Sequence, residues 1–519
     1  MKKLLKISAV ILMALALLAC RKESDMLHDF SYNDELLFGQ AKNSFGEKFK
    51  ILWEGLNSNY AIWDYEAKQG LDWDKVYDVY YPKFVKLDTL AKSRQVTDKE
   101  LISLLSAVVE PLHDGHLFVE MLNHSTGSTV SVSPSFIRNN KERAQELKDL
   151  GTFRHPELYY YVETKRTVKE IKSVDATFEA QYNASLDSAR TWVKKTLDTL
   201  GGKTVVTAEE LSLQRTAQDL DAALDKTVNL QTDKMIEEEF NKVALRYAYL
   251  AIPGFHTLDP ELTEAGMRIT YALLDGNIAY LSFNSFKISS YLTTLTQQAE
   301  TMEPYAATLV HQVRDAWESW FNAIQELHAA GQLGGVIIDV RNNGGGMSDD
   351  FAYVLGALVP SGGLRVMDCR FKRGVGRYDY SPLTPMVMDT FSGGHVTVTE
   401  PIVVLANARS VSMAEVTGLG TRRVKNAKLI GTRTWGGFCA LTENSCYSLT
   451  YSGKVGVEGV TPVFVYCPMV AALDLDGTVL EGTGVTPDIE VSLDLKAWNK
   501  GLGPDSQLDR AVEYIKSVK

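Results

Sequence analysis

The stretch "GGVIIDVRNNGGG", residues 334–346, decides the fold class of this 519-residue chain. Its apolar run at 336–340, broken only by Asp339, is typical of a buried strand. The run ends in the polar residues 341–343, which three glycines, Gly344 to Gly346, follow. Glycines after a strand let backbone N–H groups turn toward a ligand, as an oxyanion hole requires. A plain turn explains a glycine triplet equally well, so the neighbouring segments must decide.

The segments on both sides of this strand predict alternating strands and helices. The segment "MRITYALLDGNIAYLSF" (267–283) reads as a hairpin that turns at Asp275-Gly276. A helix ending near Gly331 follows, because apolar residues lie on one helical face (Val313, Trp317, Phe321, Ile324 and Leu327). Strand, helix and strand at this spacing indicate a βαβ crossover. "IVVLA" (402–406), a helix after Ser412 and "AKLIGT" (427–432) repeat the pattern, so we expect an α/β core over 265–519.

Two serines follow the strand expected at 402–406, in the stretch "NARSVSMAEV" (407–416). Ser412 and Glu415 spell S-x-x-E, the capping-box signature of a helix N-terminus. Ser412 is therefore either a helix cap or a nucleophile, and these ten residues alone favour the cap. A nucleophile also needs a base, an oxyanion hole and a group that orients the base.

Two largely helical regions precede the core. Residues 36–124 form an N-terminal helical domain, with apolar residues at helical spacing in "FKILWEGL" and a capping box at Thr97 and Glu100. Residues 125–264 form an intervening segment that we expect to be mostly a helical insertion, because residues 157–252 contain no proline and repeat a helical apolar pattern. A solvated scaffold is the plain explanation of this insertion.

The first 35 residues read as an export signal and a tether. Lysines precede an apolar stretch, residues 7–19, that is too short to span a bilayer comfortably. The stretch ends in "LLAC" (17–20), which resembles the lipobox of bacterial lipoproteins. We therefore expect residues 1–19 to be a signal peptide and residues 20–35 to be a lipidated Cys20 with its tether. Acyl chains on Cys20 would anchor the protein in the bacterial cell envelope, on the periplasmic or the surface-exposed side of a membrane.

Composition and charge exclude several classes of protein. A formal net charge of −11 argues against nucleic acid or an anionic membrane surface as a partner. The four cysteines beyond Cys20 show no C-x-x-C spacing, and no H-E-x-x-H motif occurs, so we expect no metal site. Cys439 and Cys446 either pair in a disulfide or remain buried thiols.

The order of the motifs resembles the tail-specific, or C-terminal processing, serine peptidase family. The segments that carry the resemblance are "LDWDKVYDVYYPKF", "TDKELISLLSAVVEPLHDGHLFV", "IIDVRNNGGG", "NARSVSMAE", "AKLIGTRTWGG" and "EGTGVTPDIEV". The resemblance implies a crotonase/ClpP-like α/β peptidase core and a peptide or protein substrate. It also implies that Ser412 is the nucleophile and that the backbone N–H groups of Gly345 and Met413 form the oxyanion hole.

The chain departs from the processing-protease branch of that family at the base. That branch has a lysine where this chain has Gly437, in the turn "TWGG" (434–437). The turn instead resembles the tricorn-core-like branch, which uses serine with histidine and glutamate. The D-x-H motif of that branch is matched by Asp114-Gly115-His116, and its glutamate before "GVxPD" is matched by Glu481. The resemblance therefore implies a triad of Ser412, His116 and Glu481.

Three hypotheses of function follow. The first is a membrane-anchored serine peptidase that hydrolyses peptide bonds through an acyl-enzyme intermediate and needs no cofactor. The second is a catalytically silent lipoprotein that binds peptides or envelope partners on the same fold. The third is an acyl-CoA enzyme of the crotonase type, against which the export signal counts because CoA is cytoplasmic. The sequence leaves open the cleavage specificity, the oligomeric state, the membrane leaflet and the role of residues 157–252.

Overall fold

A computed structural model describes most of the chain. The described residues are 35–134, 144–150, 168–225, 235, 238–240, 242, 252–374, 376–439, 454–496 and 504–518. The expected signal peptide and Cys20 lie outside them. Within the described residues, no helix is both long and apolar enough to cross a bilayer.

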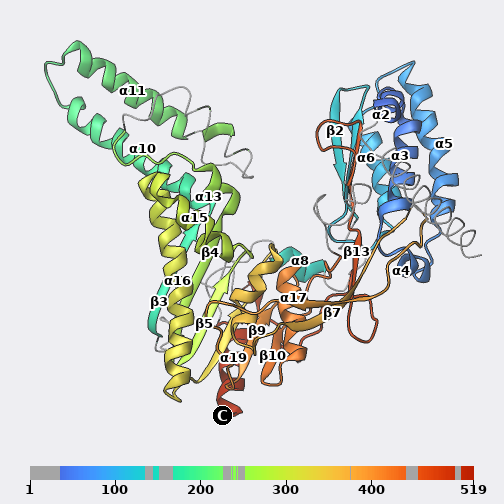
Figure 1. Ribbon diagram of the computed structural model, residues 1–519. Helices are drawn as coiled ribbons and strands as arrows, with labels where there is room; N and C mark the ends of the chain where they lie inside the picture. The colour runs from blue at the N-terminus through green and yellow to red at the C-terminus, as the bar shows by residue number, and fades with distance from the viewer. Residues whose placement is uncertain are drawn as a thin grey trace, which may run out of the picture.

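A seven-stranded sheet forms the centre of the molecule (Figure 1). Its strands, in spatial order, are β14 (Ile489–Glu490), β10 (Ala427–Gly431), β9 (Ile402–Ala406), β6 (Gly335–Asp339), β5 (Ile278–Phe283), β4 (Met267–Leu274) and β3 (Val168–Ala176). The strands from β14 to β5 run parallel, whereas β4 and β3 run antiparallel. The predicted α/β core is confirmed, as are the hairpin of β4 and β5 and the crossover from β5 to β6.

Helices cover both faces of this sheet. Alternate residues of β6 point to opposite faces, with Val336 and Ile338 in one apolar cluster and Ile337 in another. Helices α16 (Pro304–Ala329) and α17 (Met413–Gly420) pack in the first cluster, and α19 (Ser506–Ser517) packs in the second. A parallel strand buried on both faces reads as a continuous apolar run, which explains the pattern at 336–340.

Five helices make up most of the N-terminal domain. They are α2 (Glu35–Ala41), α3 (Phe45–Asn59), α4 (Trp63–Lys68), α5 (Trp73–Ala91) and α6 (Asp98–Val109). The predicted capping box forms at the start of α6, where Thr97 and Glu100 bond to each other's backbone N–H groups. The helical character expected for residues 36–124 is therefore present in the structure.

Strands from the end of the chain complete this N-terminal domain. A four-stranded sheet has the order β11 (Lys454–Val455), β12 (Val463–Tyr466), β1 (Phe118–Asn123) and β2 (Ser128–Val132). Residues of β11 and β12 share one buried apolar cluster with α3, α5 and α6. The boundary expected at 124 falls between the paired strands β1 and β2, and the boundary expected at 265 falls between the paired strands β3 and β4. The pairing of β1 with β12 leaves no local pattern in the sequence, because the two strands lie far apart in the chain. The pairing of β1 with β12 ties the turn before β1 to the core.

A small antiparallel sheet bridges the two domains. It consists of β13 (Val470–Leu473), β7 (Leu364–Phe371) and β8 (Thr384–Met388). Arg370 forms an ion pair with Asp64, and Arg377, between β7 and β8, forms one of 2.6 Å with Asp74. Both aspartates belong to the N-terminal domain, so these pairs fix the sheet to it.

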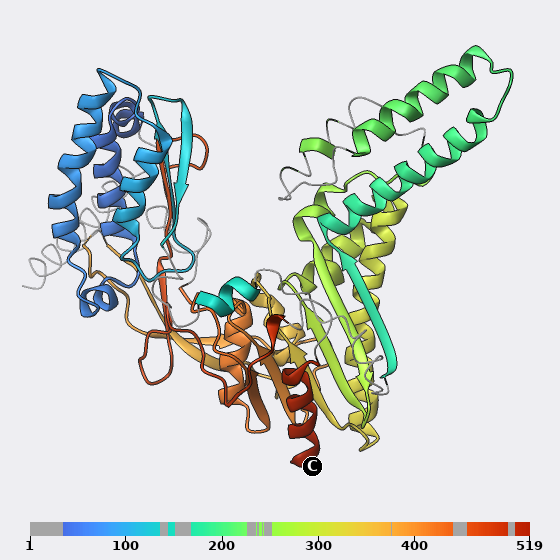
Figure 2. The same ribbon diagram turned by 180° about the vertical axis from the view of Figure 1, so that it is seen from behind.

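The intervening segment supplies an arm and an edge strand. Helices α10 (Phe178–Gly201) and α11 (Ala208–Leu224) pack through their own apolar cluster. In both views the arm and the N-terminal helices rise on opposite sides of the main sheet (Figures 1 and 2). The segment is not helical throughout, because it also contains β2 and β3, and β3 extends the main sheet.

The remaining elements are short. They are α8 (Ala144–Leu150), α13 (Pro260–Ala265), α14 (Ile288–Leu292), α15 (Thr294–Gln298), η4 (Ala299–Thr301), η5 (Ser348–Tyr353), η6 (Leu355–Ala357) and η7 (Thr421–Arg423).

Candidate active site

Ser412 lies on a strained turn between β9 and α17. Its backbone angles are φ 56° and ψ −118°, a region that residues other than glycine rarely adopt. An ordinary helix N-cap has extended backbone instead, so capping alone does not account for this conformation. Strained turns of this kind, between a strand and a helix, expose nucleophilic serines in other enzymes. The geometry of Ser412 therefore suits a nucleophile.

Ser410 has a different role. Its side chain is fully buried, and its hydroxyl donates to the carbonyl of Val340 at 2.7 Å. The same oxygen accepts the backbone N–H of Asn407 at 3.0 Å. Ser410 thus joins the end of β9 to the end of β6 and is not available for chemistry.

The glycine-rich turn after β6 lies directly against Ser412. A Cβ atom at Gly345 would come within 2.6 Å of the Ser412 Cβ, so only glycine fits there. The N–H of Gly345 donates to the side-chain oxygen of Asn343 at 2.8 Å. In this structure, therefore, one of the two expected oxyanion donors is already engaged.

Gly346 offers an alternative donor. The residues on either side of Gly346 form hydrogen bonds with the backbone of Phe286: the Gly345 carbonyl accepts the Phe286 N–H, and the Met347 N–H donates to the Phe286 carbonyl. The N–H of Gly346 consequently faces away from Phe286, and Gly346 lines a cavity together with Ser412. The other expected donor is the N–H of Met413, which begins α17. No hydrogen bond from that N–H occurs among the described residues.

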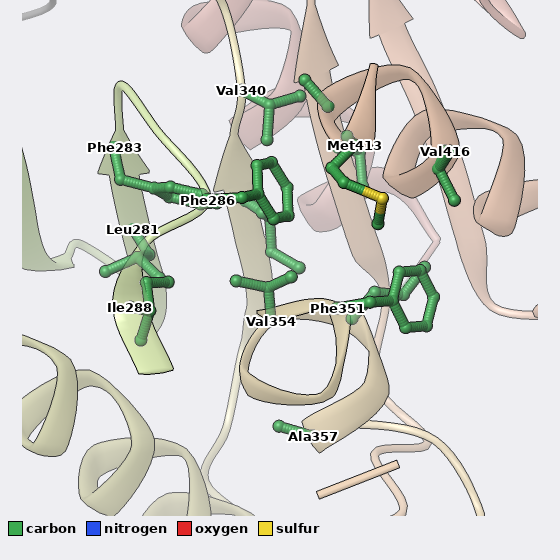
Figure 3. Packing of buried hydrophobic residues seen from close by; sticks show 14 of the residues in the cluster. Leu281, Phe283, Phe286, Ile288, Val340, Phe351, Val354, Ala357, Met413 and Val416 are labelled. Atoms are coloured by element: carbon green, nitrogen blue, oxygen red, sulfur yellow. The ribbon is translucent and has the colours of Figure 1, made fainter. Parts of the chain in front are cut away.

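An apolar cluster packs against the glycine-rich turn and against the turn that carries Ser412. Figure 3 shows Phe286, Val340, Phe351 and Met413 gathered between the strands and the short helices. The Met413 side chain is buried in this cluster, and its backbone N–H remains at the helix N-terminus. The positive end of the helix dipole is therefore next to Ser412, where it stabilises developing negative charge.

His116 reaches the same cavity from the N-terminal domain. It lies on the turn between α6 and β1, and both His116 and Ser412 line the cavity. The Asp114 carboxylate shapes the turn by accepting the N–H groups of His116 at 2.8 Å and Leu117 at 2.9 Å. Burial lowers the pKa of His116 below its ordinary value, so the imidazole is neutral near pH 7 and able to accept a proton.

Glu481 lies close to His116 and is fully buried. One of its oxygens accepts the N–H of Gly115 at 2.8 Å, and the other accepts the N–H groups of Phe438 and Cys439. Side-chain atoms of Glu481, Asp114 and His116 lie within 4.8 Å of one another. The Nδ1 atom of His116 is buried without a hydrogen-bond partner among the described residues, so the expected bond between His116 and Glu481 is not formed in this structure.

These three side chains also offer the nitrogen and oxygen donors that a divalent cation takes. Glu481 already accepts three backbone N–H groups, which point at the positions a cation would occupy. The arrangement therefore suits a hydrogen-bonded carboxylate better than a metal ligand, and the absence of a metal stays a prediction.

Glu415 is the residue whose role the sequence patterns missed. It is fully buried and accepts the N–H of Ser412 at 3.1 Å, the half of the capping box that its spacing predicts. It also accepts the Thr434 hydroxyl at 2.6 Å and the N–H groups of Gly436 at 2.6 Å and Gly437 at 2.7 Å. Glu415 thus ties the turn that carries Ser412 to the turn beside His116. Only the S-x-x-E spacing pointed to it, and that spacing indicates a cap alone.

The cavity shared by Ser412 and His116 has a volume of about 710 Å³ and is largely apolar. Its apolar lining comes from β7, β8, β13, α17, the glycine-rich turn and the segment after β10 (Met347, Met367, Phe371, Met386, Val387, Val416, Phe438 and Val470). Cys439 also lines it as a buried free thiol, and Cys446 lies outside the described residues.

The central part of the chain matches a known family. Residues 277–491 fit the model of peptidase family S41. This region is an S41 peptidase domain. S41 is a serine-type peptidase family, and the domain contains Ser412, Glu481 and both expected oxyanion residues. His116 lies outside the matched residues and reaches the S41 domain through the N-terminal domain.

A curated relative and three solved structures extend this comparison. A carboxy-terminal-processing protease of Bartonella bacilliformis is 28% identical over 178 residues, which are 34% of this chain and 36% of the relative. The chain thus matches about a third of the length of that relative.

A crystal structure from Parabacteroides merdae, described as that of a candidate peptidase, is 15% identical and has a TM-score of 0.47, covering 91% of this chain and 97% of the other. Mature CPAF complexed with lactacystin is 13% identical with a TM-score of 0.42, covering 92% and 98%. The tricorn protease is 16% identical with a TM-score of 0.27, covering 51% and 24%. None reaches a TM-score of 0.5, so the family assignment rests on the sequence match.

Proposed function

We propose that this protein hydrolyses peptide bonds through an acyl-enzyme intermediate on Ser412. One observation carries the proposal: Ser412, on a backbone strained to φ 56°, lines one cavity with His116, beside which Glu481 is buried. A nucleophile, a base and a carboxylate from three distant segments meet there, as a hydrolytic triad requires.

The residues divide the reaction between them. The Ser412 hydroxyl attacks the substrate carbonyl while the Nε2 atom of His116 takes its proton. The Met413 N–H and an N–H of the glycine-rich turn stabilise the oxyanion. His116 then gives its proton to the leaving amine, and water hydrolyses the acyl-enzyme by the same steps. These steps need no cofactor.

We further propose that the core is crotonase/ClpP-like and that the site follows the tricorn-core-like pattern of serine, histidine and glutamate. The position where the processing branch has lysine is Gly437, and a Cβ atom there would lie 3.3 Å from the Cε1 atom of His116. His116 therefore occupies the space into which a lysine at 437 would extend, which supports histidine as the base.

The proposed substrate is a peptide or protein with a bulky apolar side chain near the cleaved bond. The cavity beside Ser412 is lined by methionines and other apolar side chains, among them Met367, Met386 and Val470. Methionine adapts its shape to different neighbours, so such a pocket accepts several apolar side chains rather than a single one. An acidic side chain would lose hydration there, and it would also be repelled by Asp349, which lines the same cavity.

We also propose that the protein is lipid-anchored through Cys20 in the bacterial envelope. The support is the sequence alone, with its lysines, its apolar stretch at 7–19 and "LLAC" (17–20). Mass spectrometry of the native N-terminus tests this. We expect an acylated Cys20, and cleavage elsewhere with no lipid would contradict the anchor.

Two observations favour a second function, that of a catalytically silent peptide-binding protein. Within the part of the chain that the structure describes, the Nδ1 atom of His116 has no hydrogen-bond partner, and the Gly345 N–H is bonded to Asn343. A site that never closes would bind peptides without cleaving them. Catalytic hydrogen bonds are often open in unliganded enzymes, however, so the hydrolase remains the better supported function.

Labelling with a fluorophosphonate probe decides between these two functions. We expect a single adduct on Ser412 that the substitution Ser412→Ala abolishes. An adduct on Ser410 would show that Ser410, and not Ser412, is the nucleophile. If several probes of different size fail to label the protein, the silent function is supported.

A further inference from the structure

The turn that carries His116 contains a second buried carboxylate, Asp114. Its side chain is 3% exposed. One oxygen, Oδ1, accepts the N–H groups of His116 and Leu117, which fixes the carboxylate beside the imidazole. The other oxygen, Oδ2, is buried and has no hydrogen-bond partner among the described residues.

His116 has the complementary unpaired atom. Its Nδ1 is buried and has no hydrogen-bond partner within the described ranges, and side-chain atoms of His116 and Asp114 lie within 4.8 Å of each other. A buried acceptor and a buried donor left unpaired each cost free energy, and pairing them removes both costs. A side-chain rotation that brings the Nδ1 atom of His116 to the Oδ2 atom of Asp114 would pair both atoms.

Glu481 is less free to take this role alone. Its two oxygens already accept three backbone N–H groups, from Gly115, Phe438 and Cys439. These bonds hold the Glu481 carboxylate in place and connect the N-terminal domain to the S41 domain. Asp114, in contrast, keeps one oxygen without any bond.

We propose that Asp114 is a positioning residue whose Oδ2 accepts a hydrogen bond from the Nδ1–H of His116 and directs Nε2 toward Ser412. The inference rests on the proposed peptidase function. The proton of Nδ1 stays on the imidazole, and the bond stabilises the imidazolium that forms when Ser412 loses its proton. His116 would then be held by carboxylates from both domains, Asp114 from its own turn and Glu481 from the core.

The charges around Asp114 add a pH dependence. The ionisable groups that face it are Glu66, Glu481, His116, Tyr60, Cys439 and Cys467. Burial raises the pKa of Asp114 to about 7, with a further contribution from Glu66. Only the ionised carboxylate is a full acceptor for Nδ1–H, so Asp114 should reach its active form near neutral pH.

The test compares rates of fluorophosphonate labelling at Ser412 from about pH 5 to pH 9. Asp114→Asn keeps the oxygen that accepts the two backbone N–H groups and replaces Oδ2 with a donor. The control is Asp88→Asn, because Asp88 also accepts two backbone N–H groups, from Phe45 through Oδ1 and from Gly46 through Oδ2, in the N-terminal domain away from the cavity. This control loses one of its two backbone bonds, so it shows what structural damage alone does to the titration.

For Asp114→Asn we expect labelling to slow by on the order of tenfold or more, and the midpoint of its acid limb to move to lower pH. Asp88→Asn should keep the wild-type midpoint. An unchanged midpoint in Asp114→Asn, whatever its rate, would overturn the proposal, because a purely structural role changes the amount of active protein and not its titration. A wild-type protein that no probe labels would overturn the proposed function itself, and this inference with it.

A second measurement needs no variant. In a crystal structure of the wild-type Ser412 adduct, Nδ1 of His116 and Oδ2 of Asp114 should lie within about 3.2 Å. If Nδ1 bonds to Glu481 alone, Asp114 does not position His116 and the proposal is wrong. This measurement decides the question even if the Asp114→Asn variant does not fold.

Discussion

Gly437 lies against His116 on the wall of the active-site cavity. A Cβ atom built on Gly437 would be 3.3 Å from the Cε1 atom of His116 and 3.1 Å from a methyl group of Val411. These distances are shorter than most contacts that Cβ atoms make in proteins, so a side chain at 437 must displace the imidazole of His116 or the turn before Ser412. The absence of a side chain at Gly437 therefore leaves the space that the His116 imidazole needs.

Gly437→Ala should lower kcat/KM by about tenfold while changing stability little, because a few tenths of an ångström at the imidazole disturb proton transfer more than packing. Hydrolysis of a fluorogenic peptide and urea unfolding measure the two effects. Gly201→Ala is the control, since a Cβ there meets no atom within 4 Å. Full activity in Gly437→Ala would show that His116 tolerates displacement or is not the base.

His116→Ala should reduce kcat/KM by about 10³-fold or more, as loss of a triad base does. His113→Ala separates this effect from damage to the turn. The His113 Nδ1 bonds to Glu66 at 2.7 Å, away from Ser412, so its loss should affect stability more than rate. Equal losses of activity in both variants would contradict the assignment of His116.

The acid side of the pH–rate profile should reflect two groups. Burial lowers the pKa of His116 from 6.5 and raises that of Asp114 to about 7. His116 acts as a base only above its own pKa, and Asp114 accepts a hydrogen bond fully only above its own. The kcat/KM of the wild type should therefore rise through about pH 7 and level off above it. A profile that rises only above about pH 9 would instead indicate a lysine base.

Stability should fall as the pH rises from about 4.5 to 7. Burial raises the pKa of Glu415 from 4.5 to about 7, although its hydrogen bonds with Ser412, Thr434, Gly436 and Gly437 oppose this shift. Between these values the unfolded chain releases the proton while the folded protein keeps it, so the free energy of unfolding decreases. Each pKa unit corresponds to 1.36 kcal/mol, which gives a loss of about 3 kcal/mol for this group.

Urea unfolding at several pH values measures this loss. Asp114 adds to the decrease, because burial raises its pKa as well. A protein that becomes more stable between pH 5 and 7 would show that the hydrogen bonds to Glu415 outweigh its burial.

The candidate site residues that could be predicted from the sequence are those that lie within contiguous sequence motifs. The motif order singled out Ser412, His116 and the glycine-rich turn, and in the structure residues of all three line one cavity. Periodicity also predicted the α/β core, because buried parallel strands and the helix α16 leave local patterns.

The missing parts depend on contacts between distant segments. Gly115 and Glu481 are 366 positions apart, and they meet because β1 pairs with β12. No periodicity in the sequence indicates such a pairing, so the sequence could not predict that segments so far apart share one sheet. Glu415 was recognised only as a cap, since its bonds with Thr434 and Gly437 form after the turns have packed. The bond between the Gly345 N–H and Asn343 is likewise a detail of turn geometry that the sequence does not contain.

Ser410 and Ser412 provide the sharpest test, because two substitutions of one kind, two positions apart, should have opposite effects. Ser412→Ala should abolish peptide hydrolysis, with a loss of about 10⁴-fold or more, and leave the free energy of unfolding nearly unchanged. Ser410→Ala should keep most of the activity but destabilise the protein by about 1–3 kcal/mol, because it leaves the Asn407 N–H without its buried acceptor and removes one of the two hydrogen bonds that the Val340 carbonyl accepts. Hydrolysis of an apolar peptide and urea unfolding, measured on both variants, give the comparison. A stable but inactive Ser410→Ala beside an active Ser412→Ala would reverse the roles of the two serines.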